Sequence, residues 1–452
     1  MVERVDVVVL GLGPGGEDLA GRLAEAGLAV VGIDAELVGG ECPYWGCIPS
    51  KMMIRAANLL AEGRRVDGMA GTAIVTPDWG PVARRIRDEA TDDWDDRVAV
   101  ERLESKGARV VKGWGRLDGP GRVVVGDDVY VSDRIVLNTG ARAWAPPIPG
   151  LADIDYWTNR EIIEAESLPG TLVVLGGGAI GVELGQAVRR FGVEVTIVEG
   201  SDRVLAAEEP EASALIHRVL AAEGLDVVTG ARITAAGRRG DQFVLTLDGH
   251  EEVVGDRLLV ATGRRPDLAG LGVASIGLDE TARSVPTDGR LRAAPGVWAI
   301  GDITGVGAFT HVSMYQAAIV VADILDQPTP DADYRALPRV TFSDPEIGSV
   351  GLSEAAARES GLAVRTGQAP IPQSARGFIH KVGNEGFIKL VEDADRGVLV
   401  GATSAGPTGG EVLSFLVLAV HAEIRTEQLR HMIYAYPTFH RAIEAALADL
   451  GG

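Results

Sequence analysis

The sequence predicts an α/β protein with two parallel-sheet units followed by a C-terminal α+β unit. Two observations support this fold class. A strand, glycine turn and helix occur twice in the chain, and the last segment mixes short strands and helices without such a turn. At 452 residues the chain is long enough for about three domains of about 150 residues each. Its apolar fraction of 46% and charged fraction of 24% exclude a disordered or fibrous protein.

The first segment, residues 1–147, begins with an apolar run that is typical of a buried parallel strand. A glycine turn, a helical stretch and a second apolar run follow, and the second run ends in an acidic residue. The first apolar run is 5–10, and the glycines of the turn are Gly11, Gly13 and Gly16. The helical stretch is 17–26, and the second apolar run is 28–33, followed by Asp34. This is the order of a βαβ unit with a tight glycine turn.

The second segment, residues 148–268, follows a proline-rich junction and repeats the same order. Its features are 171–175, Gly176, Gly178, Gly181, 193–198 and Glu199. In both segments the acidic residue lies 23 residues after the first glycine, so the two units form an internal repeat.

Each glycine of such a turn has its own physical purpose. The first permits a tight bend, the second lets the backbone approach a pyrophosphate, and the third lets the helix pack closely on the strand. The helix N-terminus attracts the anion, and the acidic residue accepts hydrogen bonds from a ribose. One match is weak evidence in a glycine-rich chain, but two matches with equal offsets predict two Rossmann-like dinucleotide-binding domains. Two dinucleotides in one chain are typical of a flavin that receives electrons from a nicotinamide.

Two further segments complete the chain. Residues 269–336 contain a predicted strand at 296–300 and a predicted helix at 311–325. The last segment, residues 337–452, has no phosphate-binding glycine motif, and its predicted strands are 339–342, 386–391 and 398–402.

The charge and the hydropathy pattern exclude several classes of partner. A net charge of −21 disfavours binding to nucleic acid and to an anionic membrane surface. No apolar run reaches the roughly 18 residues of a membrane span, and the N-terminus lacks the basic and apolar regions of a secretory signal. We therefore expect a cytoplasmic protein, in which structural disulfides are rare.

The chain has 2 cysteines, Cys42 and Cys47, and their proximity makes them a candidate redox or metal pair. On a regular helix their Cα atoms would be further apart than a disulfide spans, about 4.4–6.8 Å. A disulfide would therefore need a distorted chain, which Pro43 and Gly46 suit. An inert pair and a zinc half-site are the alternatives. No cysteine or histidine cluster lies nearby to complete the roughly four ligands of zinc, so no metal is expected.

The stretch GGECPYWGCIPSK at 39–51 resembles the active-site signature of the pyridine nucleotide-disulfide oxidoreductases, the group of dihydrolipoamide dehydrogenase, glutathione reductase and mercuric reductase. The resemblance runs essentially end to end, through the stretches 139–140, 261–266, 299–302, 343–346 and 350–352. It implies FAD binding by residues 1–147 and 269–336, NAD(P) binding by 148–268, and a C-terminal dimerisation domain at 337–452 in a homodimer.

The resemblance also implies the roles of individual residues. Cys47 would be the thiol beside the flavin and Cys42 the thiol that meets the substrate, with a redox-active disulfide between them. Lys51 matches a lysine near the reactive flavin nitrogen. Glu183 matches the glutamate that pairs with this lysine beside the nicotinamide. Such a pair is expected because a buried charge requires a partner of opposite charge. Asp302 matches an acid that binds the ribityl chain. The other cofactor contacts implied are Thr139, Gly140, Gly263 and Gly301.

The end of the second nucleotide-binding strand predicts which nicotinamide is used. A carboxylate at Glu199 favours the free 2′-hydroxyl of NADH and would repel a 2′-phosphate. Arg203 could contact a 2′-phosphate, so NADPH is the alternative donor. The plainer interpretation of Arg203 is an arginine on a solvated loop that binds no nucleotide.

The last segment departs from the family pattern. The family has a histidine-proline motif with a glutamate five residues after the histidine, and this chain has Tyr436 and Arg441 in those places. A tyrosine hydroxyl is a poor base at neutral pH, and arginine accepts no proton. His440 is either an alternative base or a surface histidine. The missing dyad predicts poor turnover of lipoamide or glutathione disulfide, and the bulk of Tyr44 and Trp45 predicts altered access.

These observations favour one function and leave alternatives open. We expect an FAD-dependent NAD(P)H:disulfide oxidoreductase that reduces an unusual small disulfide, a metal or another electrophile through Cys42 and Cys47. One alternative is a mercuric-reductase-like or quinone-reducing, diaphorase-type enzyme, although the C-terminal vicinal cysteines of mercuric reductases are absent from the sequence. Another is a redox-sensing scaffold that performs no catalysis.

Overall fold

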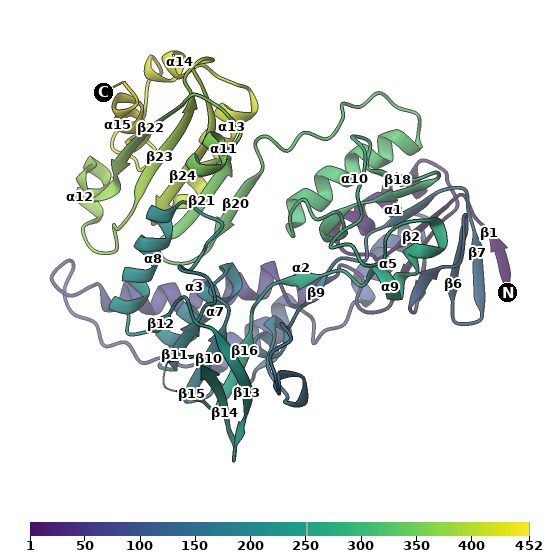
Figure 1. Ribbon diagram of the computed structural model, residues 1–452, viewed down its shortest axis with the longest axis horizontal. Coiled ribbons are helices and arrows are strands. Elements are labelled where there is room, and N and C mark those ends of the chain that lie inside the picture. The colour runs from purple at the N-terminus through teal and green to yellow at the C-terminus, as the bar shows by residue number, and fades with distance from the viewer. Residues whose placement is uncertain (250–251, 452) are drawn as a thin grey trace.

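The first sheet has six strands and is assembled from two distant parts of the chain (Figure 1). The computed structural model describes residues 1–249 and 252–451. The strand order is β18 (Arg292–Ala294), β19 (Val297–Ala299), β8 (Ile135–Leu137), β2 (Val7–Leu10), β3 (Val30–Asp34) and β4 (Arg109–Lys112). Neighbouring strands are parallel except for β18 and β19. Strands β18 and β19, which follow the second glycine motif in the sequence, thus belong to the same sheet as β2, which precedes the first glycine motif.

The first glycine turn connects β2 to helix α1 (Pro14–Glu25). Gly11 has a φ of +90°, and a Cβ atom there would lie 2.2 Å from the carbonyl oxygen of Asn138. A Cβ atom at Gly16 would lie 2.1 Å from the carbonyl oxygen of Gly11. Only glycine fits at both positions, so the turn is tight and α1 packs directly against it.

The second parallel sheet repeats this arrangement. Its strand order is β12 (Asp226–Val228), β11 (Glu194–Val198), β10 (Thr171–Leu175) and β16 (Arg257–Val260), and helix α7 (Ala179–Arg190) follows β10. Gly176 has a φ of +112°, and a Cβ atom at Gly181 would lie 2.0 Å from the carbonyl oxygen of Gly176. The internal repeat in the sequence is therefore also a repeat in backbone geometry.

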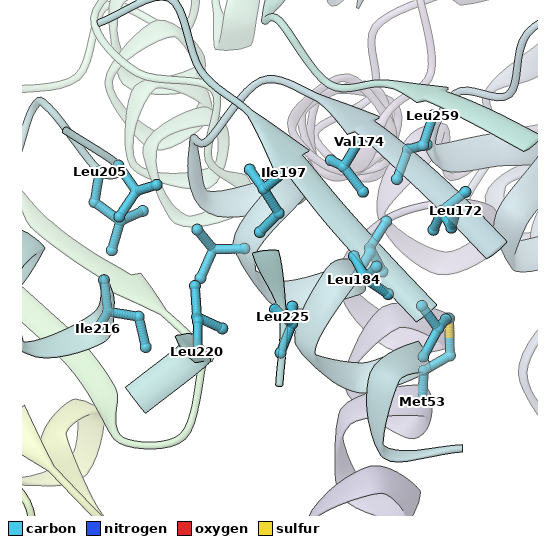
Figure 2. Close-up of a cluster of buried hydrophobic side chains, with 14 of the residues drawn as sticks. Met53, Leu172, Val174, Leu184, Ile197, Leu205, Ile216, Leu220, Leu225 and Leu259 are labelled. Carbon is cyan, nitrogen blue, oxygen red and sulfur yellow. The ribbon is translucent and has the colours of Figure 1, made fainter. Parts of the chain in front are cut away.

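Helix α3 (Cys47–Arg64) joins the first unit to the second. Met53 of α3 is fully buried in the hydrophobic cluster that covers the second sheet, where it is grouped with Leu172, Leu184 and Ile197 (Figure 2). Burial of a large apolar side chain stabilises this contact by about 1.5–3 kcal/mol. The contact fixes α3, and hence the cysteine at its N-terminus, relative to the second glycine turn.

The C-terminal unit is a five-stranded antiparallel sheet with helices packed on it (Figure 1). The strand order is β20 (Pro338–Thr341), β21 (Glu346–Gly351), β24 (Val398–Gly406), β23 (Phe387–Asp393) and β22 (Val364–Pro370). Helices α13 (Gly409–His421) and α15 (Ala442–Asp449) contribute to its core. The predicted α/β fold class with a C-terminal α+β unit is confirmed.

Two smaller sheets lie in connections for which the sequence analysis predicted no strands. One has the order β1 (Val2–Arg4), β7 (Asp128–Val131), β6 (Arg122–Val125) and β5 (Gly115–Leu117). The other consists of β13 (Ile233–Arg239), β14 (Gln242–Leu247) and β15 (Val253–Gly255). The segment boundaries expected after residues 147, 268 and 336 remain predictions.

Buried ion pairs connect the C-terminal unit to the second unit. Arg190, whose side chain is 3% exposed, lies 2.6 Å from Glu223 and 2.8 Å from Asp344. Lys389 is almost as deeply buried and lies 3.0 Å from Glu209. None of the helices in the described ranges combines the length and apolar character needed to cross a bilayer.

Candidate active site

One cavity of about 1620 Å³ runs between the three units and brings most of the predicted site residues together. The predicted residues that line it are Gly11, Gly13, Asp34, Cys42, Cys47, Lys51, Thr139, Gly140, Gly176, Gly178, Glu183, Glu199, Gly263, Gly301 and Asp302. Gly16 and Gly181 lie behind the two turns, where each permits the close helix packing described above. The two glycine turns therefore open into the same space as the two cysteines.

The cysteines lie on two helical pieces separated by a break. Helix α2 (Glu41–Tyr44) carries Cys42, and α3 begins at Cys47. Gly46 lies in the break, where a Cβ atom would be 2.9 Å from the carbonyl oxygen of Glu41. The distortion expected between the cysteines is thus present. Both cysteines are free thiols in this structure, which corresponds to the reduced form of the pair.

The environment gives the two thiols opposite acidities. A hydrogen bond from Cys42 lowers the pKa of Cys47 to about 6, and Thr310 and the charge of Lys51 act in the same direction. The pKa of Cys42 is raised far above its ordinary value by the hydrogen bond it donates to Cys47 and by burial. The Thr310 hydroxyl oxygen lies 3.5 Å from the Cys47 sulfur. At neutral pH the pair therefore consists of a Cys47 thiolate and a Cys42 thiol.

Lys51 and Glu183 form the ion pair that the resemblance implied. The Lys51 ammonium donates to Glu183 Oε2 at 2.8 Å, and the glutamate side chain is 7% exposed. Glu183 Oε1 accepts the backbone N–H of Phe342 at 2.8 Å. A buried carboxylate with two partners is held in one orientation, which fixes the ammonium beside the thiols.

The first unit offers a cradle that fits a dinucleotide. The N-terminus of α1 follows Gly13, and Asp34 lies at the end of β3. Asp34 accepts backbone N–H groups from Leu12 at 2.7 Å and from Glu36 at 2.8 Å, while burial raises its pKa. The glycines leave the space in front of the helix open, and an anion there would meet the positive end of the helix dipole.

The second unit has the same parts. Glu199 accepts the N–H of Gly177 and that of Ser201, both at 2.6 Å, which holds its carboxylate at the end of β11. A Cβ atom at Gly178 would meet nothing within 4 Å, so the backbone there is open to the cavity. Arg203 is not a freely solvated arginine, because its Nη2 donates to the carbonyl oxygen of Ala206 at 2.9 Å.

Arg160 and Glu36 in the cavity wall were not predicted from the sequence, and they form one charged group with Glu41, Arg264 and Asp302. Arg160 Nε donates to Glu41 at 2.7 Å, and Arg160 Nη2 donates to Glu36 at 2.6 Å. Arg264 lies 3.7 Å from Glu41 and 3.6 Å from Asp302, whose pKa is raised by burial. Two guanidinium groups thus compensate three carboxylates beside the thiols. No motif marks Arg160 or Glu36, which lie 124 residues apart in the sequence.

Tyr44 and Trp45, the bulky residues between the cysteines, are both buried. The Trp45 indole N–H donates to Glu164 at 2.6 Å, and Arg160 stacks on its ring at 4.1 Å from the centroid. Trp45 also lines the cavity that contains the thiols, and the expectation of altered access remains a prediction.

Tyr436 and His440 are not among the residues that line the cavity. The Tyr436 side chain is 70% exposed and stacks with the Arg441 guanidinium at 5.4 Å. The His440 ring lies 6.2 Å from the ring of Tyr434. The structure does not bring either residue to the thiols of its own chain. Among the described residues, no cluster of three or more His, Cys, Asp or Glu side chains is arranged to hold a metal ion.

Comparison with known proteins gives consistent matches over the whole length. The family model described as pyridine nucleotide-disulphide oxidoreductase matches residues 5–317, and the dimerisation domain of that family matches residues 337–447. A dihydrolipoyl dehydrogenase from Thermus scotoductus is 33% identical over 99% of this chain and 98% of its own. A mercuric reductase from Bacillus cereus is 29% identical over 98% of this chain and 71% of its own.

Solved structures match at the level of the fold and the domain order. The HOCl-induced flavoprotein disulfide reductase RclA from Escherichia coli, in a Cu(II) complex, has a TM-score of 0.86 and 26% identity, and 99% of each chain is covered. LpdA from Mycobacterium tuberculosis has the same TM-score and identity, again with 99% of each chain covered.

Proposed function

The chain belongs to the pyridine nucleotide-disulphide oxidoreductase family, and from this premise we propose that it reduces an external acceptor through Cys42 and Cys47 with electrons from NADH. Members of the family are flavoprotein oxidoreductases that act on sulfur groups and use FAD and NAD(P), and this chain is an enzyme of that class. The observation that carries the proposal is the single cavity lined by both glycine turns, both thiols and the Lys51–Glu183 pair. Electron transfer between two nucleotides and a thiol pair requires this proximity.

The residues present fit FAD in the first unit. Gly11, Gly13 and the N-terminus of α1 would hold its pyrophosphate, Asp34 its ribose and Asp302 its ribityl chain. When bound, FAD accepts a hydride from the nicotinamide and passes an electron pair to the disulfide. Lys51, oriented by Glu183, would supply a fixed positive charge near the flavin.

The two thiols have different roles toward a disulfide acceptor. Cys42 attacks one acceptor sulfur, and its own proton goes to the thiol that leaves. Cys47, as the thiolate, then attacks the sulfur of Cys42 and releases the second acceptor thiol, which takes a proton from water. The products are two acceptor thiols and a Cys42–Cys47 disulfide, so two electrons have moved from the protein to the acceptor.

The acceptor class follows from the missing histidine. Because the pKa of Cys42 is raised and neither Tyr436 nor Arg441 is an effective base, a poorly reactive disulfide would be attacked slowly. The acceptor we propose is therefore strongly electrophilic: an activated small disulfide, or a metal ion or other electrophile that accepts electrons without base assistance.

Anaerobic titration with NADH tests the proposal. One equivalent should produce the long-wavelength absorbance of a thiolate lying against the flavin, and Cys47→Ser should abolish this absorbance. Cys42→Ser should lose turnover with the acceptor while retaining flavin reduction. If Cys42→Ser turned over at the wild-type rate, electrons would pass directly from flavin to acceptor and the relay would be refuted.

We propose NADH as the preferred donor. The Glu199 carboxylate is held in place by two backbone N–H groups, where it suits a ribose hydroxyl and opposes a phosphate. Arg203 is engaged by Ala206 and lies 3.6 Å from Asp202, so its charge is partly compensated. The ratio of kcat/KM for NADH to that for NADPH should exceed one and should fall in Glu199→Gln. A wild-type ratio below one would contradict the assignment.

We also propose that the protein is a homodimer formed through the C-terminal unit. This unit matches the family's dimerisation domain, and it exposes apolar side chains to solvent in the single chain. These side chains include Phe378 at 73%, Leu418 at 57% and Ile433 at 95%. Sedimentation should give a dimer that Ile433→Asp dissociates, and a monomeric wild-type protein would refute the proposal.

A further inference from the structure

An exposed tryptophan lies in the cavity wall on the side of Asp34. Trp114 lines the cavity, yet 67% of the residue is exposed. It stands between β4 and β5, and the N–H of the preceding Gly113 donates to the carbonyl oxygen of Asp34 at 2.9 Å. This backbone hydrogen bond places the indole next to the residue that ends β3.

The two glycines that flank Trp114 hold it outside the core. Gly113 has a φ of +149°, which side chains rarely adopt. A Cβ atom at Gly115 would lie 2.4 Å from Leu10 Cδ2, so a side chain there would displace the Leu10 side chain of β2. The positive φ of Gly113 and the missing side chain of Gly115 therefore let this segment lie close to β2 while Trp114 lines the cavity.

Arg142 is stacked on the indole and is itself held in position. Its guanidinium carbon lies 4.6 Å from the centroid of the Trp114 ring. Its Nη2 donates to Glu36 Oε1 at 2.8 Å, and the Glu36 N–H donates to Asp34 at 2.8 Å. Trp114, Arg142, Glu36 and Asp34 therefore form one connected group at one end of the nucleotide cradle.

We propose that Trp114, backed by Arg142, is the platform on which the adenine ring of bound FAD stacks. The inference rests on the proposed use of the first unit by FAD. If the pyrophosphate lies at the N-terminus of α1 and the ribose at Asp34, the adenine continues beyond Asp34. There Trp114 and Arg142 line the cavity and present an aromatic and a planar cationic face. Adenine stacks on such faces, and its burial would cover the exposed indole.

The same cavity offers a matched control. Trp144 also lines it and also stacks with an arginine, Arg265, at 3.9 Å. However, the backbone N–H of Trp144 donates to the carbonyl oxygen of Gly263. This tryptophan is therefore connected to the second unit and not to Asp34. Its replacement should leave the adenine platform intact.

The test is the affinity of the holoenzyme for FAD, measured from flavin released on serial dilution. Trp114→Ala should raise the dissociation constant by about fivefold or more, since base stacking on an aromatic ring contributes at least that factor. Trp114→Phe should retain most of the affinity, and Trp144→Ala should differ little from wild type. Because Trp114 is exposed, the melting temperature of the FAD-free Trp114→Ala protein should be unchanged.

A second measurement separates this proposal from the function itself. In the holoenzyme the Trp114 indole should be shielded from acrylamide quenching, and release of FAD should expose one further tryptophan in wild type but none in Trp114→Phe. A wild-type protein that binds no FAD would refute the proposed function. A wild-type protein that binds FAD with the same affinity as Trp114→Ala would refute the adenine platform alone.

Discussion

Lys51 Nζ donates a 2.8 Å hydrogen bond to Glu183 Oε2, and this pair joins the helix that begins at Cys47 to the helix that follows the second glycine turn. The ammonium also lies 4.6 Å from the ring centroid of Phe342, a residue of the C-terminal unit. Three segments that are distant in sequence therefore meet at one buried carboxylate.

Replacing Lys51 with methionine should destabilise the protein and slow flavin reduction by NADH. Removal of one partner of a fully buried ion pair costs about 3–5 kcal/mol, and the cost is lower here because Lys51 is 35% exposed. We expect a loss of about 1–2 kcal/mol in urea denaturation, with slower reduction in stopped-flow absorbance. The double variant with Glu183→Gln should recover stability, whereas simple additivity of the two single effects would show that the pair does not stabilise the fold.

The absorbance of the reduced holoenzyme should depend on pH through Cys47. Its pKa is lowered to about 6, so the thiolate persists above this pH and is protonated as the pH falls through it. The long-wavelength band should therefore be complete at pH 8 and lost below about pH 5. The measurement is a spectrophotometric pH titration of the NADH-reduced protein. A midpoint near the ordinary thiol value would contradict the arrangement of donors around Cys47.

Thr310→Val should raise the pKa of the Cys47 thiolate. The threonine hydroxyl lies 3.5 Å from the sulfur and helps to lower that pKa. A hydrogen bond to a charged group is worth about 1.5 kcal/mol or more, which corresponds to about one pKa unit. The same titration measures the shift, and Thr310→Ser, which keeps the hydroxyl, is the control. An unchanged midpoint in Thr310→Val would exclude Thr310 as a positioning residue.

Arg190→Met should strongly destabilise the folded protein. Arg190 is 3% exposed and pairs with Glu223 and Asp344. Its removal leaves Glu223 without its buried cation, whereas Asp344 keeps a second partner in Arg65 at 2.9 Å. We expect a loss of about 3 kcal/mol or more in the free energy of unfolding measured by urea denaturation. Arg97→Met is the control, because the pair of Arg97 with Glu101 is 62% exposed on both sides and should contribute less than about 1 kcal/mol. Similar losses in the two variants would show that the buried network is not stabilising.

Much of the fold could be predicted because its strands are apolar runs followed by glycine turns. The run 171–175 coincides with β10 (Thr171–Leu175), and the expected helix at 311–325 is α10 (Thr310–Ile324), displaced by one residue. The first strand is shorter than its apolar run and spans Val7–Leu10. The sheets formed by β5–β7 and β13–β15 were missed, because their short strands carry no glycine motif and pair mostly as local hairpins.

The candidate site was predictable where it depends on local motifs. The cysteines, the glycine turns, Asp34 and Glu199 are all found by their spacing along the chain. Thr310 and Arg160 were missed, because each reaches its partner across more than a hundred residues and neither belongs to a recognisable pattern. Such contacts arise from tertiary packing, which one sequence does not reveal.

The opposite acidities of the two thiols have an energetic consequence for the electron relay. Since Cys47 is ionised and Cys42 keeps its hydrogen at neutral pH, closing and opening the disulfide exchanges one proton for every two electrons. The midpoint potential of the couple should then fall by about 30 mV per pH unit, half the slope of an ordinary dithiol. Acidification of the surroundings would consequently change the driving force toward the acceptor less than it changes that of a typical thiol reductant.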